Sequence, residues 1–176
     1  MFLLLNGSFG IGKTTVAELL QREIPGARIY DPERIGYVLR RLPAWVLGRS
    51  ALPDDYQDLR LWRTLTVRGA RRAHRGAALV IVPMAFTNLA YFRALADALA
   101  TAGEVRRLCL VAPAELVAQR LAGRARAEGR AVTPFEARRS ADCIAAHANP
   151  QFGTPVDACR APADIVTEIR GMLAIG

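Results

Sequence analysis

The sequence predicts an α/β fold in which five parallel strands form one sheet between helices. Short apolar runs alternate with segments of helical periodicity, a pattern typical of parallel strands joined by right-handed crossover helices. The run Leu79–Val82 is apolar at every position, as a strand covered by helices on both sides must be. The chain has 176 residues, of which 52% are hydrophobic and 23% charged, so we expect one folded domain, 1–176.

The clearest predicted strands are short apolar runs, and a polar or turn-forming residue marks where a predicted strand ends. Asn6 and Gly7 end the first run, Asp31 ends the second, and Pro83 ends the third. In chain order, the predicted strands are Phe2–Leu5, Arg28–Tyr30, Leu79–Val82, Val105–Val111 and a weaker one near Val156.

Each predicted helix carries apolar residues three or four positions apart. The first helix has Val16, Leu19 and Leu20 on one face, and Pro32 suits the first turn of the second. In chain order, the predicted helices are Lys13–Glu23, Glu33 to about Leu42, a helix after Asp55 that contains Leu59, Trp62 and Leu65, Leu89–Leu99, Pro113 to about Gly123, Pro134–His147 and Ala163–Leu173.

The chain carries 24 basic and 16 acidic side chains, a formal net charge of +8. Every basic residue except Lys13 is arginine. Drift toward arginine codons in a GC-rich genome explains most of this excess, because either cation solvates a surface. The charge allows an acidic partner, but the sequence has no zinc-finger spacing, RNA-binding run or basic heptad region. We therefore expect no nucleic-acid partner.

The composition excludes several other classes of protein. No apolar run approaches the roughly 18 residues that cross a bilayer, and no charged leader precedes Met1–Leu5, so we expect neither a transmembrane segment nor a signal peptide. Cys109, Cys143 and Cys159 form no CxxC pair, which argues against a disulfide framework or zinc site and suits a reducing cytoplasm. The apolar stripe of the last helix could contact an anionic membrane face, but packing in the core is favoured.

The segment after the first predicted strand matches the phosphate-binding pattern G-x-x-x-x-G-K-[ST]. It comprises Gly7, Ser8, Phe9, Gly10, Ile11, Gly12, Lys13 and Thr14, and Thr15 follows it. Glycines let backbone N–H groups point into one concavity, and the positive amino end of the next helix faces the same place. A chance glycine-rich turn is the alternative, but the strand before and the helix after favour the motif. The sequence therefore predicts that ATP is a ligand.

Three side chains of this loop have predicted roles in nucleotide binding. Lys13 would contact the β- and γ-phosphates, because a compact ammonium group fits inside the loop where a planar guanidinium would clash with the backbone. Thr14 would hold Mg²⁺ through its hydroxyl, and Thr15 would contact the α-phosphate. We therefore expect Mg²⁺ as a second cofactor.

Phosphoryl transfer also needs a group that places the metal or orients the acceptor. The strand Leu79–Val82 ends in Pro83 and supplies no acid. Asp31 ends the second strand at the same edge of the sheet, and it would hold a Mg²⁺-bound water or accept a proton from a substrate hydroxyl. The alternative is that Asp31 only caps the helix that begins at Pro32, although both roles can hold together.

Arginines cluster around residue 125. Arg120 and Arg124 are four residues apart and share a helix face, and Arg126 and Arg130 follow in a polar stretch. We predict a lid segment, residues 121–134, near which Arg120 and Arg124 neutralise charge on the phosphates. A solvated arginine-rich face is the alternative.

Several short motifs together resemble those of the tunicamycin-resistance proteins, small bacterial P-loop proteins related to shikimate and nucleoside monophosphate kinases. The motifs are Gly7–Thr14, Tyr30-Asp31-Pro32-Glu33, Leu61-Trp62-Arg63, Ile81-Val82-Pro83-Met84 and Tyr91-Phe92. The resemblance covers most of the chain, most firmly up to Phe92. It implies a P-loop NTPase fold of the nucleoside-monophosphate-kinase type, and an ATP-binding protein that confers resistance to tunicamycin, a nucleoside antibiotic with a fatty acyl chain.

The resemblance also implies which residues face the acceptor and the adenine. Asp31 and Arg34 would face the acceptor site, and the substrate side would be lined by Trp62, Arg63, Pro83 and Met84. Arg160 lies between the last strand and the last helix, where related kinases contact adenine. Structural alternatives stay open: Trp62 could belong to the core, Arg34 to the surface, and Pro83-Met84 could simply end a strand.

Two functions from different classes follow. The first is an ATP- and Mg²⁺-dependent phosphotransferase that acts on a small hydroxylated molecule such as a tunicamycin-like nucleoside. The second is a protein that sequesters the drug without chemistry, with the acyl chain against the apolar region from Trp45 to Trp62. The sequence does not give the oligomeric state.

Overall fold

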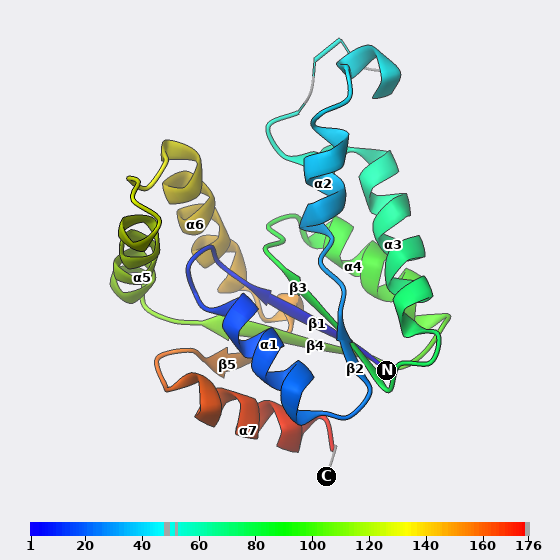
Figure 1. Ribbon diagram of the computed structural model, residues 1–176, viewed down its shortest axis with the longest axis vertical. Coiled ribbons are helices and arrows are strands. Elements are labelled where there is room, and N and C mark those ends of the chain that lie inside the picture. Colours follow the sequence, from blue (N-terminus) through cyan, green and yellow to red (C-terminus); the bar gives the residue numbers. More distant parts are fainter. Residues whose placement is uncertain (48–49, 52, 175–176) are drawn as a thin grey trace.

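The computed structural model describes residues 1–47, 50–51 and 53–174, and its centre is a five-stranded parallel sheet (Figure 1). The strands lie in the order β2-β3-β1-β4-β5. Their bounds are β1 Phe2–Gly7, β2 Ala27–Ile29, β3 Leu79–Met84, β4 Val105–Val111 and β5 Thr154–Asp157. The predicted fold class is therefore confirmed.

Seven α-helices and three short 3-10 helices connect the strands in the described part of the chain. The α-helices are α1 Lys13–Glu23, α2 Glu33–Leu39, α3 Arg60–His74, α4 Leu89–Ala100, α5 Ala114–Ala127, α6 Pro134–His147 and α7 Pro162–Met172. The 3-10 helices are η1 Ala44–Leu47, η2 Tyr56–Asp58 and η3 Pro150–Phe152. None of the described helices is long and apolar enough to cross a membrane.

The two faces of the sheet carry separate apolar cores, which explains why β1 is apolar from Phe2 to Leu5. Leu3 and Leu5 pack with residues of α1 and α7, whereas Phe2 and Leu4 pack with residues of α3 and α4. Figure 1 shows these helix pairs on opposite sides of the strands. Because successive side chains of a strand point to opposite faces, a strand covered on both sides loses the usual polar alternation.

Strand β3 is longer than predicted, since it continues through Pro83 to Met84. Pro83 lies opposite Leu5 of β1, and Met84 lies opposite Asn6. Pro83 is tolerated here because β2 pairs with β3 only as far as Ile81, so no bond to β2 is lost at the proline.

Two predicted helix ends were also wrong. Helix α2 stops at Leu39 instead of Leu42, because Pro43 disfavours helical geometry in the residue before it. Helix α5 continues past Gly123 to Ala127. Leu121 and Ala125 are both buried on one face of α5, and this packing outweighs the weak helix propensity of a single glycine.

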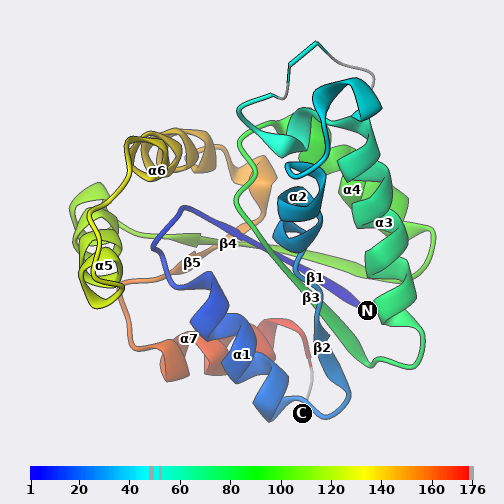
Figure 2. The same ribbon diagram turned by 45° about the horizontal axis from the view of Figure 1, so that its top comes forward.

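The loop between β1 and α1 lies at the carboxyl ends of the strands, and we use the word crevice for the region that this loop, the start of α2 and α6 surround. Figure 2 shows the pair α5–α6 on one side of this loop and α2 on the other. In an open parallel sheet, ligands bind outside the carboxyl ends of the strands, where neighbouring connections diverge. The fold therefore places the predicted phosphate loop at the expected position.

Candidate functional site

The loop from Gly7 to Lys13 has the backbone geometry of a phosphate cradle. Gly10 and Gly12 have φ values of 79° and 107°, a left-handed region that side chains with a Cβ rarely adopt. Gly12 is the N-cap of α1, no side chain caps this end, and the first turn holds no acidic residue. The positive end of the helix therefore faces the loop without a neutralising group, which suits an anionic ligand.

Gly10 also has a packing role that the motif alone does not reveal. A Cβ built on Gly10 would lie 3.0 Å from the Cβ of Leu121 and 3.2 Å from its backbone N. Leu121 is buried on α5, so the loop and α5 are in direct contact at this point. Glycine here allows the helix that precedes the predicted lid to pack closely against the phosphate loop.

Lys13, the single lysine of the chain, folds back onto the loop. Its Nζ donates hydrogen bonds to the carbonyl oxygens of Gly7, at 2.9 Å, and Ser8, at 2.8 Å, and lies 5.7 Å from the centre of the Phe9 ring. Burial lowers the pKa of Lys13, and the carboxylate of Glu33 acts in the opposite direction. The ammonium group is thus held inside the loop, at the position that a phosphate-binding lysine requires.

The remaining side chains of the loop fit a nucleotide with Mg²⁺. The Ser8 hydroxyl is buried and has no hydrogen-bond partner in the part of the chain that the structure describes, while Thr14 and Thr15 are exposed at the start of α1. The described residues contain no group of three His, Cys, Asp or Glu that could hold a metal on its own. Mg²⁺ is commonly bound through few protein ligands together with substrate phosphates, so the Thr14 hydroxyl fits a shared site of this kind.

Across the crevice from Lys13, two acids follow the end of β2. The Asp31 Oδ1 accepts a hydrogen bond of 2.9 Å from the backbone N–H of Glu33, which is the helix-start role that the sequence left open. Glu33 is half-buried, and it interacts electrostatically with Lys13, Asp31, Arg124 and Asp55. Burial raises the pKa of Glu33 above its ordinary value, and Lys13 opposes this shift. Glu33, which the sequence reasoning missed, is therefore an acid whose charge interacts with that of Lys13.

A second cationic group lies on α6 and closes the far side of this crevice. The Arg139 guanidinium forms an ion pair of 2.8 Å with Asp55 and donates to the carbonyl oxygen of Ala85 and the hydroxyl of Thr87. Arg139 is largely buried, with 12% of its side chain exposed. Such a group, positioned by three partners, can fix one end of a polar ligand or hold α6 against η2.

Neighbouring contacts connect the same two sides of the crevice. The Arg40 guanidinium, just after α2, lies 5.3 Å from the ring centre of Tyr56 and 5.8 Å from that of Phe135 on α6. Gln57 donates to the carbonyl oxygen of Ala85 at the end of β3. These contacts therefore join η2, α6 and the end of β3 into one continuous wall.

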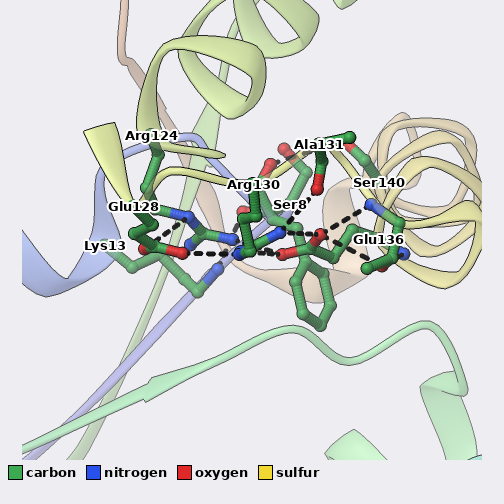
Figure 3. A network of polar contacts seen from close by, with 10 residues as sticks. Ser8, Lys13, Arg124, Glu128, Arg130, Ala131, Glu136 and Ser140 are labelled. Atoms are coloured by element: carbon green, nitrogen blue, oxygen red, sulfur yellow. Dashed lines mark hydrogen bonds and ion pairs between the residues drawn. The ribbon is translucent and has the colours of Figure 1, made fainter. Parts of the chain in front are cut away.

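The arginines of the predicted lid are held together by one acid, Glu136. Figure 3 shows its carboxylate between Arg124, at 2.9 Å, and Arg130, at 2.7 Å. The same side chain accepts from the backbone N–H of Thr133, whose hydroxyl in turn accepts from the Glu136 N–H; this is a capping box at the start of α6. Arg130 also pairs with Glu128.

The structure defines which residues of the predicted lid segment, 121–134, are helical and which form the connection. Residues up to Ala127 are helical, so only the stretch from Glu128 to Thr133 is a connection. Ser140 on α6 donates to the carbonyl oxygen of Phe9, which attaches α6 to the phosphate loop. Arg124 and Arg130 therefore stand near the loop, and in this structure they bind the carboxylates of Glu128 and Glu136.

Arg120 connects the phosphate loop with the opposite strand end. Its Nη1 donates to the carbonyl oxygens of Ile11, at 3.1 Å, and Ala158, at 2.8 Å. Arg160, two residues after Ala158, is exposed and pairs with Glu168 of α7. The predicted adenine side is thus next to the loop, and Arg120 fixes the distance between the two segments.

Of the residues predicted on the substrate side, Trp62 and Met84 share one apolar core, and Trp62 and Arg63 line one cavity. Trp62 is 1% exposed, packs in the core and donates from Nε1 to the Pro32 carbonyl oxygen at 3.0 Å. Met84 is also buried, Pro83 is part of β3, and Arg34 is exposed on α2. Arg63 stacks on the ring of Tyr91, where it borders a cavity between α3 and α4. Two alternatives that the sequence left open fit these positions: Trp62 as a core residue, and Pro83-Met84 as the end of a strand.

A family model described as an AAA domain matches residues 2–144. The chain belongs to this AAA domain family. The match includes the phosphate loop, both acids after β2 and the arginines of α5, so the whole crevice lies within the AAA domain. No curated protein matches the chain.

The fold of this AAA domain protein matches solved structures over nearly its whole length. A tunicamycin resistance protein from Deinococcus radiodurans is 24% identical, with a TM-score of 0.76 and coverage of 99% of this chain and 96% of that chain. A gluconokinase from Sinorhizobium meliloti 1021 is 19% identical, with a TM-score of 0.66 and coverage of 98% and 90%.

A shikimate kinase from Acinetobacter baumannii, in complex with shikimate, is 19% identical, with a TM-score of 0.62 and coverage of 98% and 93%. The resemblance to tunicamycin-resistance proteins and shikimate kinases, predicted from short motifs, is thus confirmed at the level of the fold. The chain is a P-loop protein with a kinase-like fold.

Proposed function

We propose that the protein is an ATP- and Mg²⁺-dependent phosphotransferase that acts on a small hydroxylated molecule, such as a tunicamycin-like nucleoside. The observation that carries this proposal is that Lys13, held inside the glycine loop by two backbone carbonyl oxygens, interacts electrostatically with the half-buried carboxylate of Glu33. A protein that only binds nucleotide needs the loop, whereas transfer to a hydroxyl also benefits from a nearby carboxylate.

The residues would divide the work as follows. Lys13 and the backbone N–H groups of the loop hold the phosphates, and Thr14 and the phosphates hold Mg²⁺, which would neutralise charge on the phosphate oxygens. The acceptor hydroxyl forms a bond to the γ-phosphorus, and the bond from this phosphorus to the bridging oxygen breaks. The hydroxyl proton passes to the carboxylate of Asp31 or Glu33, which both orient the acceptor.

The arginines near the loop would neutralise further negative charge on the phosphates. Arg120 already contacts the loop backbone, and Arg124 lies close enough to Lys13 and Glu33 to affect the pKa of both. On this proposal residues 121–134 act as the lid, and Arg124 exchanges Glu136 for a phosphate when nucleotide binds. Arg160 and the turn after β5 would face the adenine. We propose a cytoplasmic, single-domain enzyme.

A drug-binding protein without phosphoryl transfer is the second candidate. It is favoured by exposed apolar residues near the crevice: Trp45 is 78% exposed, and Tyr37 and Val38 are 59% and 60% exposed. These side chains could hold an apolar tail, although residues 48, 49 and 52 of the predicted region from Trp45 to Trp62 lie outside the described residues.

Incubation with γ-labelled ATP and candidate nucleosides separates the two functions. The phosphotransferase transfers label to at least one acceptor, and the Asp31→Asn and Glu33→Gln variants lose transfer while they retain ATP binding. If no acceptor is labelled and the drug is recovered unmodified from resistant cells, transfer is wrong. Resistance that survives Asp31→Asn and Glu33→Gln but not Lys13→Ala would support sequestration instead.

A further inference from the structure

A cavity of about 190 Å³ lies between the amino-terminal halves of α3 and α4, outside the crevice described above. Its walls are mainly apolar and come from two helices and the end of the β3 connection. The larger side chains that line it are Trp62, Thr66, Val67, Phe86, Tyr91 and Leu95. Thr64 and Ala94, which also line it, are exposed, so the cavity opens to solvent on one side.

The floor of the cavity contains a polar atom without a partner. The Thr66 hydroxyl is buried, with 1% of the residue exposed, and it forms no hydrogen bond with any of the described residues. Thr64, on the same helix, instead donates to the carbonyl oxygen of Arg60, one turn earlier. A buried hydroxyl with no partner is destabilising, and it can be satisfied by a ligand or by water in the cavity.

The rim of the cavity contains a fixed cation. The Arg63 guanidinium lies 4.1 Å from the centre of the Tyr91 ring and donates one hydrogen bond, of 2.7 Å, to the carbonyl oxygen of Gln57. Within the described residues it forms no ion pair, although Arg139, Arg124 and Arg130 all do. A guanidinium has five N–H donors, so most of those on Arg63 remain for a carboxylate, which it can bind with two parallel hydrogen bonds.

We propose that this cavity is a second binding site, for a small carboxylate with an apolar chain or ring. The carboxylate binds Arg63 at the rim, and the apolar part fills the space between α3 and α4. A cavity of about 150 Å³ accepts benzene, so this one accommodates an aromatic ring or a chain of about six to eight carbon atoms. The aromatic walls formed by Trp62, Phe86 and Tyr91 suit either.

The site is separate from the phosphate loop and from the acids after β2, since none of its lining residues belongs to either, although Trp62 and Arg63 are residues that the resemblance places on the substrate side. It nevertheless borders the crevice. Trp62, one wall of the cavity, packs on Tyr56 with ring centres 5.3 Å apart and donates to the carbonyl oxygen of Pro32. A ligand that presses on this indole would thus contact a side chain that supports the start of α2.

The test is calorimetric titration of the nucleotide-free protein with hexanoate, octanoate and benzoate. Octylamine serves as a probe with the same chain as octanoate but the opposite charge. We expect saturable binding of at least one carboxylate with one site per chain, and at least about tenfold weaker binding of octylamine. Arg63→Gln should weaken the carboxylate about tenfold, whereas Arg68→Gln, at an exposed arginine of the same helix that does not line the cavity, should not.

Two variants that fill the space decide whether binding occurs in this cavity. Ala94→Phe narrows it from α4, and Thr66→Leu fills it from the floor; both should abolish binding, whereas Ala100→Phe, elsewhere on α4, should not. Thermal unfolding first establishes which of the variants is folded. The proposal is overturned if no carboxylate binds saturably at millimolar concentration, or if binding persists in a folded cavity-filling variant. ATP binding is measured separately, so its failure leaves this result unaffected.

Discussion

Replacement of Glu136 tests the arginine network beside the phosphate loop. Its carboxylate accepts hydrogen bonds from Arg124 and Arg130, and from the backbone N–H and hydroxyl of Thr133. Glutamine at the same position of a capping box can still accept from the Thr133 N–H, so Glu136→Gln removes the charge and keeps the cap. Glu136→Ala removes both.

The magnitude follows from the exposure of the partners. The side chain of Glu136 is 12% exposed, and those of Arg124 and Arg130 are 44% and 36% exposed. Ion pairs of this kind contribute about 0.2–1 kcal/mol each, so Glu136→Gln should reduce the free energy of unfolding by about 1 kcal/mol. Loss of the cap adds about 0.5–1 kcal/mol in Glu136→Ala. For a chain of this size, about 1 kcal/mol lowers the Tm by about 2–4 °C.

The effect should depend on pH in a defined direction. Hydrogen bonds from Arg130 lower the pKa of Glu136 from 4.5 to about 2 in the folded state. A carboxylate with a depressed pKa stabilises the fold fully above its unfolded pKa and loses this contribution as the pH falls toward the folded value. Urea unfolding should therefore show the largest difference between the native protein and Glu136→Gln at neutral pH, and a shrinking one between about pH 4.5 and pH 2.

Glu128→Gln is the matched control, because its carboxylate is 48% exposed and takes no part in the cap. It should cost less than Glu136→Gln at every pH. An equal loss in the two variants, or a loss from Glu136→Gln that does not change with pH, would refute the account of Glu136 as the acid that organises this network.

Three further predictions concern the crevice. Gly10→Ala should lower the free energy of unfolding by about 1–3 kcal/mol in urea titrations, because the new Cβ would crowd Leu121 and alanine would have to adopt a left-handed φ. A change below about 0.5 kcal/mol would contradict the observed contact. Since burial raises the pKa of Glu33, the midpoint of the acid limb in a pH–rate profile should lie above the ordinary carboxyl pKa of 4.5. Glu33→Gln should lower kcat/KM about 100-fold or more, and an unchanged kcat/KM would exclude Glu33 as a base. Arg120→Ala should weaken the binding of MgATP about tenfold in calorimetry, while Arg126→Ala, at an exposed arginine, should not. Equal MgATP affinity in the native protein and Arg120→Ala would show that the contact with Ile11 does not matter for nucleotide binding.

The sequence predicted the sheet and the phosphate loop well because both depend on local patterns. The strand Phe2–Gly7 begins with an apolar run that ends at a turn signal, and the spacing from Gly7 to Thr14 has a direct chemical meaning. The end of β3 could not be predicted, because Pro83 is tolerated only where β2 has already stopped. That fact belongs to strand pairing, which no local pattern contains.

The walls of the crevice were harder to predict than its loop. Asp31 and Glu33 are two residues apart, and the sequence alone does not say which carboxylate is buried near Lys13. Arg139 is one of 23 arginines, and only the fold shows that it is largely buried against Asp55. The motif Asp31-Pro32-Glu33 was a usable sequence signal for Glu33, whereas no sequence pattern pointed to Arg139.

Calorimetric titration of MgATP into the native protein and Lys13→Ala tests the central claim most directly. Lys13 is the only lysine and its ammonium group already lies within the loop, so the native protein should bind one MgATP per chain, and Lys13→Ala should bind at least about 100-fold more weakly. Lys13→Arg should not restore the affinity, because a planar guanidinium does not fit the cradle. Equal affinity in the native protein and Lys13→Ala, or no MgATP binding by the native protein, would contradict the account.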